Sequence, residues 1–150
     1  MKWSRTKQQM VLKLQEIERA RKRAAEAHLM EARAAAEQAE QATSEAQSEL
    51  LQAEIGWTGH LKSASFNVEL GQALGAHLLH QQRALEVRQD HERSHKRELD
   101  EQTEIWRKIE ASVRSADKNL SSARRALVKR SEASREQELS ERTMWKWFGR

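Results

Sequence analysis

Apolar residues recur in alternating steps of three and four along the second half of the sequence. Counted from Ala64, the first repeating position holds eight apolar residues among eleven: Ala64, Gly71, Leu78, Leu85, Glu92, Leu99, Trp106, Val113, Leu120, Leu127 and Ser134. The second repeating position adds Leu74, Ile109, Ala116 and Ala123. This spacing places apolar residues along one side of a helix, where only another helix can bury them. The pattern predicts a coiled coil, and with it a mechanical or recognition role.

The first half of the sequence carries a less regular apolar stripe. Met10, Leu14 and Ile17 open the stripe, its phase slips near Ala24, and alanines continue it: Ala32, Ala35, Ala39, Ala42, Ala46 and Ala53. Alanine lets two helix backbones approach closely but buries little area per residue. We expect this half to pack loosely, and we expect the slip to alter the supercoil locally.

Glycines mark the turn between the two stripes. Four of the five glycines, Gly56, Gly59, Gly71 and Gly75, fall within twenty residues, and glycine weakens or ends a helix. The predicted fold is all-α, with two long helices in an antiparallel coiled-coil hairpin that forms a single domain over residues 1–150. The first helix is expected at about 4–54, the turn at about 55–65, and the second, longer helix at about 66–147.

Net charge along the chain supports the antiparallel pairing. A turn near Leu61 sets residues 24–61 (net −6) against 62–97 (net +2), and residues 1–23 (net +6) against 98–120 (net −2). Opposite signs meet in both halves, although an exposed ion pair contributes only about 0–1 kcal/mol.

The same turn predicts which apolar residues meet and which stay uncovered. Three pairs are expected across the hairpin: Trp106 with Ile17, Ile109 with Leu14, and Val113 with Met10. Residues from Leu127 onward then project beyond the first helix, so the stripe through Leu120, Ala123 and Leu127 has no cover. We interpret this end as a surface for an external partner, with fraying or a displaced turn as the alternatives.

Composition limits the protein to a thin core. Charged residues make up 33% of the chain and hydrophobic residues 37%, and proline, cysteine and tyrosine are absent. A chain without cysteine has no disulfide framework and no thiolate chemistry. No signal peptide is recognisable, and no apolar run approaches the roughly 20 residues that a membrane span needs. We therefore expect a cytoplasmic protein.

One motif suggests metal chemistry. His91, Glu92 and His95 follow the H-E-x-x-H spacing that binds zinc in peptidases, where the glutamate acts as the general base. Two helices offer no cleft for a third ligand, and Glu98 and Glu101 stand where the extended motif needs glycine and histidine. We therefore favour the interpretation that Glu92 and His95 are polar coiled-coil positions that fix the pairing register.

No other catalytic pattern is present in the sequence. His77 and His80 lie three residues apart without carboxylate or thiolate neighbours, so we expect them at a surface or interface rather than around a metal. The sequence has no glycine-rich phosphate loop, nucleophile elbow or paired-carboxylate motif. We expect no enzymatic activity and no cofactor.

Basic and aromatic residues gather where the two chain ends are expected to meet. The basic residues match phosphate groups or an acidic protein surface: Lys2, Arg5, Lys7, Arg21, Lys22, Arg23, Arg124, Arg125, Lys129 and Arg130. Glutamates from Glu132 to Glu141 and a net charge of only +4 favour a protein partner over nucleic acid. The tail of Trp145, Trp147 and Phe148 suits a membrane interface or a protein pocket, with disorder as the alternative.

Apolar residues also cluster around the expected turn, at Trp57, Phe66, Leu70, Ala73, Leu74 and His77. Phe66, Leu70, Ala73 and His77 have helical spacing and share one face. The face is either a binding surface or a set of side chains that fold back over the loop.

The pattern Phe66, Leu70, Ala73, Leu74 and His77, the chain length and the unequal hairpin resemble one family. This is the family of the flagellar export protein FliJ and its YscO-type injectisome counterparts, the central stalks of type III secretion ATPases. The tyrosines of that family in this region have no counterpart in the present chain. The resemblance implies that Phe66, Leu70, Ala73 and His77 bind the export-gate protein, and that Trp57 and Leu50 continue this surface.

The resemblance also implies the partners. A stalk of this family enters the hexameric export ATPase, reaches the cytoplasmic domain of the membrane gate protein, works beside the ATPase regulator, and takes part in the cycling of export chaperones. It works in the cytoplasm at the inner-membrane export apparatus. We expect the basic end to dock on the ATPase ring through Arg5, Lys7, Arg21, Arg23, Leu120, Arg124, Arg125 and Leu127.

Two other classes stay open on the sequence alone. One is a coiled-coil adaptor or scaffold unrelated to secretion, with its apolar stripes paired between two chains. The other is the metal hydrolase that the H-E-x-x-H spacing suggests. The sequence does not distinguish a flagellar from an injectisome system.

Overall fold

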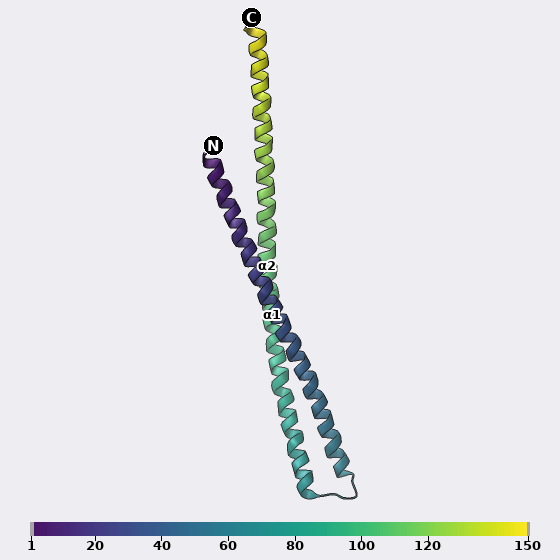
Figure 1. Ribbon diagram of the computed structural model, residues 1–150. Coiled ribbons are helices and arrows are strands. Elements are labelled where there is room, and N and C mark those ends of the chain that lie inside the picture. The colour runs from purple at the N-terminus through teal and green to yellow at the C-terminus, as the bar shows by residue number, and fades with distance from the viewer. Residues whose placement is uncertain (1, 150) are drawn as a thin grey trace. The chain divides into compact units, whose positions relative to one another are not determined.

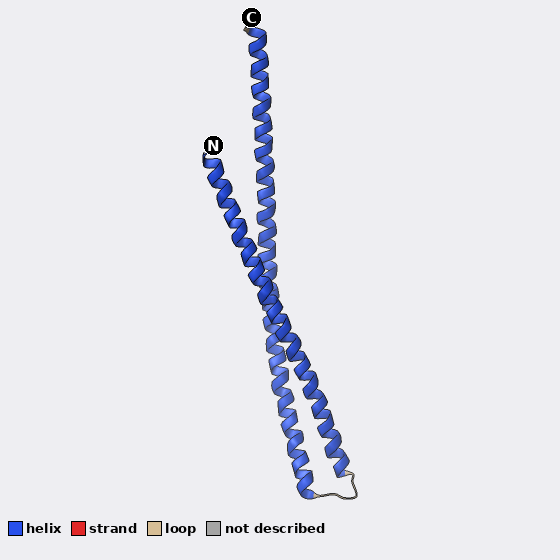
Figure 2. Cartoon of the chain, viewed as in Figure 1, coloured by secondary structure: helices blue, strands red, loops and turns tan. Residues whose placement is uncertain are grey.

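The computed structural model describes residues 2–149, with side chains described for residues 5–149. Two helices account for almost all of this range: α1 runs from Lys2–Leu61 and α2 from Val68–Phe148 (Figure 1). The part of the chain that the structure describes contains no strand (Figure 2). The predicted all-α helical hairpin with a longer second helix is confirmed.

The turn is shorter and later than predicted. α1 continues through Gly56 and Gly59 to Leu61, and only residues 62–67 separate it from α2. A glycine inside a helix costs only about 1 kcal/mol, which a long helix tolerates. Asn67 begins α2 as its N-cap, because its side-chain oxygen accepts the backbone N–H of Glu69 at 3.0 Å.

Contacts between residues divide the chain into two units, and each helix contributes to both. Unit 1 consists of Met1–Arg23 and Lys108–Arg150, and unit 2 is Ala24–Arg107. The two units are described separately below.

In unit 2, α1 faces α2 with small residues at regular heptad spacing. We call such a row of shielded residues the seam. Its α1 members alternate in steps of three and four: Ala25, Leu29, Ala32, Ala36, Ala39, Thr43, Ala46, Leu50, Ala53, Trp57 and His60. Five of these alanines are buried, and Ala46 is only 1% exposed. The heptad spacing of the seam is not interrupted in unit 2. The seam contains Ala36 and Thr43, whereas the sequence pattern had predicted Ala35 and Ala42 at these positions.

The seam of α2 agrees with the predicted first heptad position over eight repeats. Its members are half-buried or buried within their own units: Gly71, Leu78, Leu85, Glu92, Leu99 and Trp106 in unit 2, and Val113 and Leu120 in unit 1. Ala64, Leu127 and Ser134 are exposed. The repeat therefore describes packing from Gly71 to Leu120 and ends there.

In unit 1 the pairing differs from the prediction. The side-chain amide of Gln15 donates to Asp117 at 2.8 Å, and the hydroxyl of Ser112 lies 3.5 Å from Glu18. Val113 therefore lies beside the part of α1 near Glu18 and not beside Met10. The expected register was wrong because it was counted from a turn near Leu61, and the turn lies later.

The seam of α1 in unit 1 is mainly polar. Its shielded positions are Val11, Gln15, Glu18 and Lys22, which continue the heptad phase of unit 2. The residues that were expected to pair with α2, Met10, Leu14 and Ile17, are 61%, 59% and 55% exposed. The predicted phase slip near Ala24 does not occur, so the apolar stripe faces away from α2.

Two glycines at the start of α2 make room for aromatic rings. A Cβ atom added at Gly75 would lie 3.3 Å from Nε1 of Trp57, and one added at Gly71 would lie 3.3 Å from Cε2 of Phe66. A Cβ atom at Gly56 or Gly59 would have no such atom within 4 Å. Gly71 and Gly75 therefore serve packing, whereas Gly56 and Gly59 do not.

This contrast predicts opposite effects for two alanine substitutions. Gly56→Ala should raise the free energy of unfolding by about 0.5–1 kcal/mol, because alanine lowers the entropy cost of an exposed helical position. Gly75→Ala should show none of this gain, because its methyl group presses on the ring of Trp57. Urea unfolding followed by circular dichroism measures both, and an equal gain at the two positions would contradict this role of Gly75.

Candidate functional site

The residues predicted to bind a partner near the turn form an exposed face. We call Phe66, Leu70, Ala73 and His77 the turn surface. Phe66 is 51% exposed and Leu70 is 48% exposed, and Ala73 and His77 are also exposed. Leu74, by contrast, is half-buried in the seam. The expectation that Phe66 belongs to the second helix was wrong, because α2 begins at Val68 and Phe66 lies in the loop. On α2 itself, Leu70, Ala73 and His77 form a solvent-facing row beside the row that packs against α1.

Trp57 and Leu50 lie in the seam and are half-buried. A shallow groove lies beside them, and its lining includes Glu49, Gln52 and Gly56 from α1, with Leu74, His77 and Gln81 from α2. His77 thus joins the turn surface to this groove. The sequence pattern does not single out Glu49 or Gln52, because their place beside His77 depends on the pairing of the two helices.

The loop holds Phe66 in a defined position. The rings of His60 and Phe66 are stacked with centroids 5.3 Å apart and an angle of 29° between their planes. Nε2 of His60 lies 3.0 Å from the carbonyl oxygen of Asn67 and 3.3 Å from its backbone N–H. A protonated Nε2 donates to the carbonyl, and an unprotonated Nε2 accepts from the N–H. Phe66 therefore folds back over its own loop in part, while about half of its surface stays exposed.

A polar cluster lies in the seam of unit 2. Glu92 and Lys96 form an ion pair with 2.8 Å between Oε1 and Nζ. The buried hydroxyl of Thr43 lies 3.0 Å from the carbonyl of Ala39 and 3.3 Å from the carbonyl of Arg88. The hydroxyl also interacts with the Glu92 carboxylate. It has one proton for these three acceptors, so it links the two helices without satisfying all three at once.

The hydrogen bond from Lys96, followed by the one from Thr43, holds the pKa of Glu92 below its ordinary value of 4.5. The same pair raises the pKa of Lys96. The cluster is therefore an ionised polar contact across an otherwise small-residue seam, and it suits the register role predicted for Glu92.

The H-E-x-x-H spacing does not assemble into a metal site. His91 and His95 are exposed, while Glu92 turns into the seam. Within residues 2–149, no group of three or more His, Cys, Asp or Glu side chains is placed to hold a metal ion. The expectation that His95 lies in the seam was wrong: His95 is exposed, and Leu99 is the next shielded residue of α2 after Glu92.

The two units carry net charges of opposite sign. Unit 1 has 19 basic and 8 acidic residues, a net +11, whereas unit 2 has 8 basic and 15 acidic residues, a net −7. The sum of the two is the net +4 of the whole chain. An overall charge of +4 therefore conceals a strongly basic unit.

Part of the predicted ring-docking set comes together in unit 1. Leu120, Arg124 and Arg125 line one groove with Gln15 of α1, and Val128 also lines it. Leu127 is 41% exposed but does not line this groove. Val128 was missed, because the heptad count assigns the apolar role to Leu127.

The remaining docking candidates lie along α1 of unit 1. Arg5, Lys7, Arg21 and Arg23 are exposed. Arg21 is also within 3.4 Å of Glu18, three residues earlier. These four side chains place positive charge along α1, and none of them lines the groove formed by Leu120, Arg124 and Arg125.

The end of α2 has the most exposed large side chains among the described residues. Trp145, Trp147 and Phe148 are 80%, 81% and 86% exposed. In the described part of the chain, neither helix is long and apolar enough to cross a membrane.

Comparisons of the chain with protein-family models, curated proteins and solved structures found no match. The class that the fold itself defines is an antiparallel α-helical hairpin with an apolar turn surface in unit 2 and a basic groove in unit 1.

The shifted pKa of Glu92 predicts an acid-dependent part of the stability. The folded pKa lies below the unfolded value, so the interaction is fully present above about pH 4.5 and is lost as the pH falls through the folded pKa. Glu92→Gln should therefore flatten the dependence of unfolding free energy on pH as the pH falls below about 4.5. Urea unfolding across this window measures the slope.

The matched control is Glu101→Gln, which removes the same charge from an exposed position on the same helix. An equal change of slope in both variants would show that charge alone, and not the contact with Lys96 and Thr43, produces the effect.

Proposed function

We propose that this protein is a non-enzymatic stalk of a type III protein export apparatus. In this role it links the hexameric export ATPase to the cytoplasmic domain of the export-gate membrane protein. It works in the cytoplasm beside the ATPase regulator and takes part in chaperone cycling. The observation that carries most of the proposal is the turn surface of unit 2, which leaves Phe66 in the loop and Leu70 in the first turn of α2 about half exposed.

The turn surface has the properties of a protein-binding site. An exposed apolar row beside a turn gains free energy when a partner covers it. The stacking of Phe66 on His60 and the contacts of His60 with Asn67 hold the aromatic ring in place before binding. Little side-chain entropy is then lost on association. Phe66 and Leu70 are the expected anchors for the gate protein, and His77 extends the contact toward α1.

The basic unit suits a different partner. A net charge of +11 steers an acidic surface toward unit 1 and raises the association rate. The groove formed by Leu120, Arg124 and Arg125 adds an apolar contact between cationic groups. We assign this groove, together with Arg5, Lys7, Arg21, Arg23 and Leu127, to docking on the ATPase ring.

A coiled-coil adaptor unrelated to secretion is the second candidate. Met10, Leu14 and Ile17 favour it, because they form an exposed apolar stripe that α2 does not cover. A helix of another chain would bury this stripe. Sedimentation equilibrium distinguishes the candidates, since the stalk is expected as a monomer or weak self-associate and the adaptor as a stable dimer.

A pull-down with the purified gate domain and the purified export ATPase tests the turn surface. Phe66→Asp with Leu70→Asp should abolish gate binding, because two charges then replace the apolar anchors, and should leave ATPase binding unchanged. The control Leu79→Asp with Val87→Asp changes two comparably exposed apolar residues of unit 2 away from the turn. If the folded wild type binds neither partner, the stalk proposal fails.

Stopped-flow association with the ATPase tests the basic groove. Arg124→Glu with Arg125→Glu should slow association about tenfold or more at low salt, and the difference should shrink at high salt. The control Arg83→Glu with Arg97→Glu makes the same charge change at exposed positions in unit 2. Equal slowing in both variants would show that net charge, and not this groove, guides the contact.

A further inference from the structure

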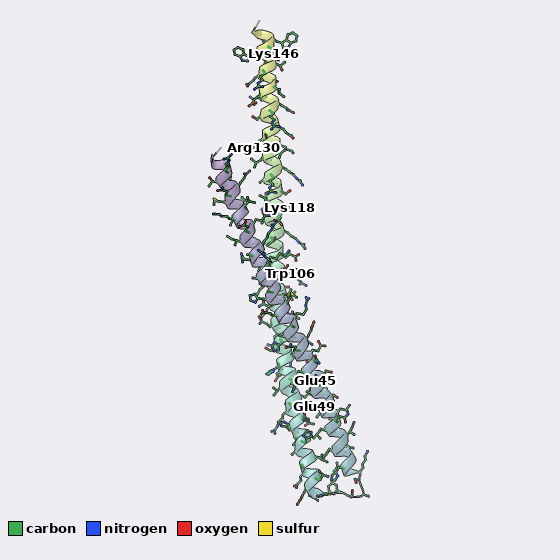
Figure 3. The ribbon with its side chains drawn as sticks, viewed as in Figure 1. Glu45, Glu49, Trp106, Lys118, Arg130 and Lys146 are labelled. Carbon is green, nitrogen blue, oxygen red and sulfur yellow. The ribbon has the colours of Figure 1, made fainter. Side chains whose placement is uncertain are left out.

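The last turns of α2 expose more apolar surface than they shield. Every described residue from 121 to 149 is exposed, and the groove that α2 lines with Gln15 of α1 ends at Glu132, well before this helix end. Leu139 and Met144 are 63% and 58% exposed, and Trp147 and Phe148 exceed both. We call Leu139, Met144, Trp147 and Phe148 the tail face. In Figure 3 the labelled Lys146 lies on this uncovered stretch of α2.

Apolar and charged residues separate around this helix end. One side forms a shallow surface lined by Glu136, Leu139, Ser140, Thr143, Met144, Trp147 and Phe148, in which Glu136 is the only charged residue. The adjoining side is lined by Glu138, Leu139, Glu141, Arg142, Thr143, Trp145 and Lys146. The helix end is therefore amphipathic, with Arg142 and Lys146 beside the aromatic residues.

The chemistry of these residues fits a lipid interface. Tryptophan has an apolar ring system with a polar N–H, and it concentrates at the boundary between lipid headgroups and acyl chains. Arginine and lysine next to such rings reach headgroup phosphates with their long side chains. An amphipathic helix with this arrangement lies in the interface and does not cross the bilayer, which agrees with the lack of any crossing helix in the described residues.

Charge selects the kind of lipid. Unit 1 carries a net +11, and an anionic leaflet attracts Lys and Arg side chains that lie near its surface. Glu138 and Glu141 oppose this attraction locally, but they lie on the adjoining side with Arg142 and Lys146. Glu136 lies at the start of the side that carries the tail face, before Leu139, and marks where the inserted stretch begins. The aromatic tail and the basic unit therefore act on the same surface.

We propose that residues 139–148 dock on an anionic lipid surface, with the tail face inserted at the headgroup boundary. This inference does not rest on the stalk function, because the tail face contains no residue of the turn surface or of the ring-docking set.

Sedimentation of the full chain with vesicles tests the proposal. The wild type should bind vesicles that contain phosphatidylglycerol and bind phosphatidylcholine vesicles much more weakly. Replacement of Trp145, Trp147 and Phe148 by serine should lower the partition coefficient at least about tenfold, because each buried aromatic contributes more than about 1.4 kcal/mol. The control replaces Leu79, Val87 and Ile105 of unit 2, all exposed, by serine and should bind as the wild type does.

A fluorescence measurement localises the contact. In a chain with Trp3, Trp57 and Trp106 changed to phenylalanine, only Trp145 and Trp147 emit. Anionic vesicles should shift this emission to the blue, and brominated lipids should quench it. Circular dichroism verifies that the variant stays helical.

Three results would overturn the proposal: no binding of the wild type to anionic vesicles, equal binding by the tail variant, or tail emission that lipid does not change. Each leaves a protein pocket as the better partner for the tail. ATPase and gate binding are measured without lipid, so the stalk proposal and the lipid proposal can fail separately.

Discussion

Close approach of the two helices through alanine is the constraint on which unit 2 depends. Ala25, Ala32, Ala36, Ala46 and Ala53 are buried, and no large side chain of the described residues is fully buried. Each methyl group contributes little, so the packing is a sum of many small contacts along the seam. The polar cluster of Thr43, Glu92 and Lys96 helps to fix the register of the two helices, because a shifted register would separate Thr43 from Glu92. The alanines alone are too similar to one another to specify the register.

Continuity of the heptad phase explains the contrast between the units. An uninterrupted α1 keeps turning at the same rate, so the side that carries alanines in unit 2 carries Gln15, Glu18 and Lys22 in unit 1. The apolar stripe of Met10, Leu14 and Ile17 then faces solvent. Unit 1 has Val113 as its one buried apolar residue among those described. In unit 1 a mainly polar seam of α1 therefore faces the apolar seam of α2, and apolar surface is left for partners.

Much of the hairpin could be read from the sequence, and the errors have a common origin. The repeat from Gly71 to Leu120 was predictable because leucine, valine and tryptophan mark one face of α2 clearly. The face of α1 was ambiguous, since alanines occur all around that helix. The turn was placed too early because Gly56 and Gly59 read as helix breakers, and the register followed that error.

The surfaces were predictable to different degrees. Helical spacing predicted that Leu70, Ala73 and His77 share one face, whereas the place of Phe66 in the loop and its stacking on His60 needed the structure. Contacts that cross between helices did not, including Trp57 over Gly75 and the groove residue Val128. The difference in net charge, +11 for unit 1 against −7 for unit 2, also became visible only when the structure divided the chain into units. The hairpin thus carries two surfaces of different chemistry, an apolar one in unit 2 and a basic one in unit 1.

Amide hydrogen exchange measured by mass spectrometry tests this account most directly. The account predicts the slowest exchange in α1 from Ala25 to Ala53 and in the part of α2 that faces it, because opening there breaks the alanine seam. It predicts fast exchange from residues 133 to 148, which lie beyond the groove that α2 lines with Gln15 and are all exposed. Strong protection of residues 133–148 in the isolated protein, equal to that of the seam, would contradict it.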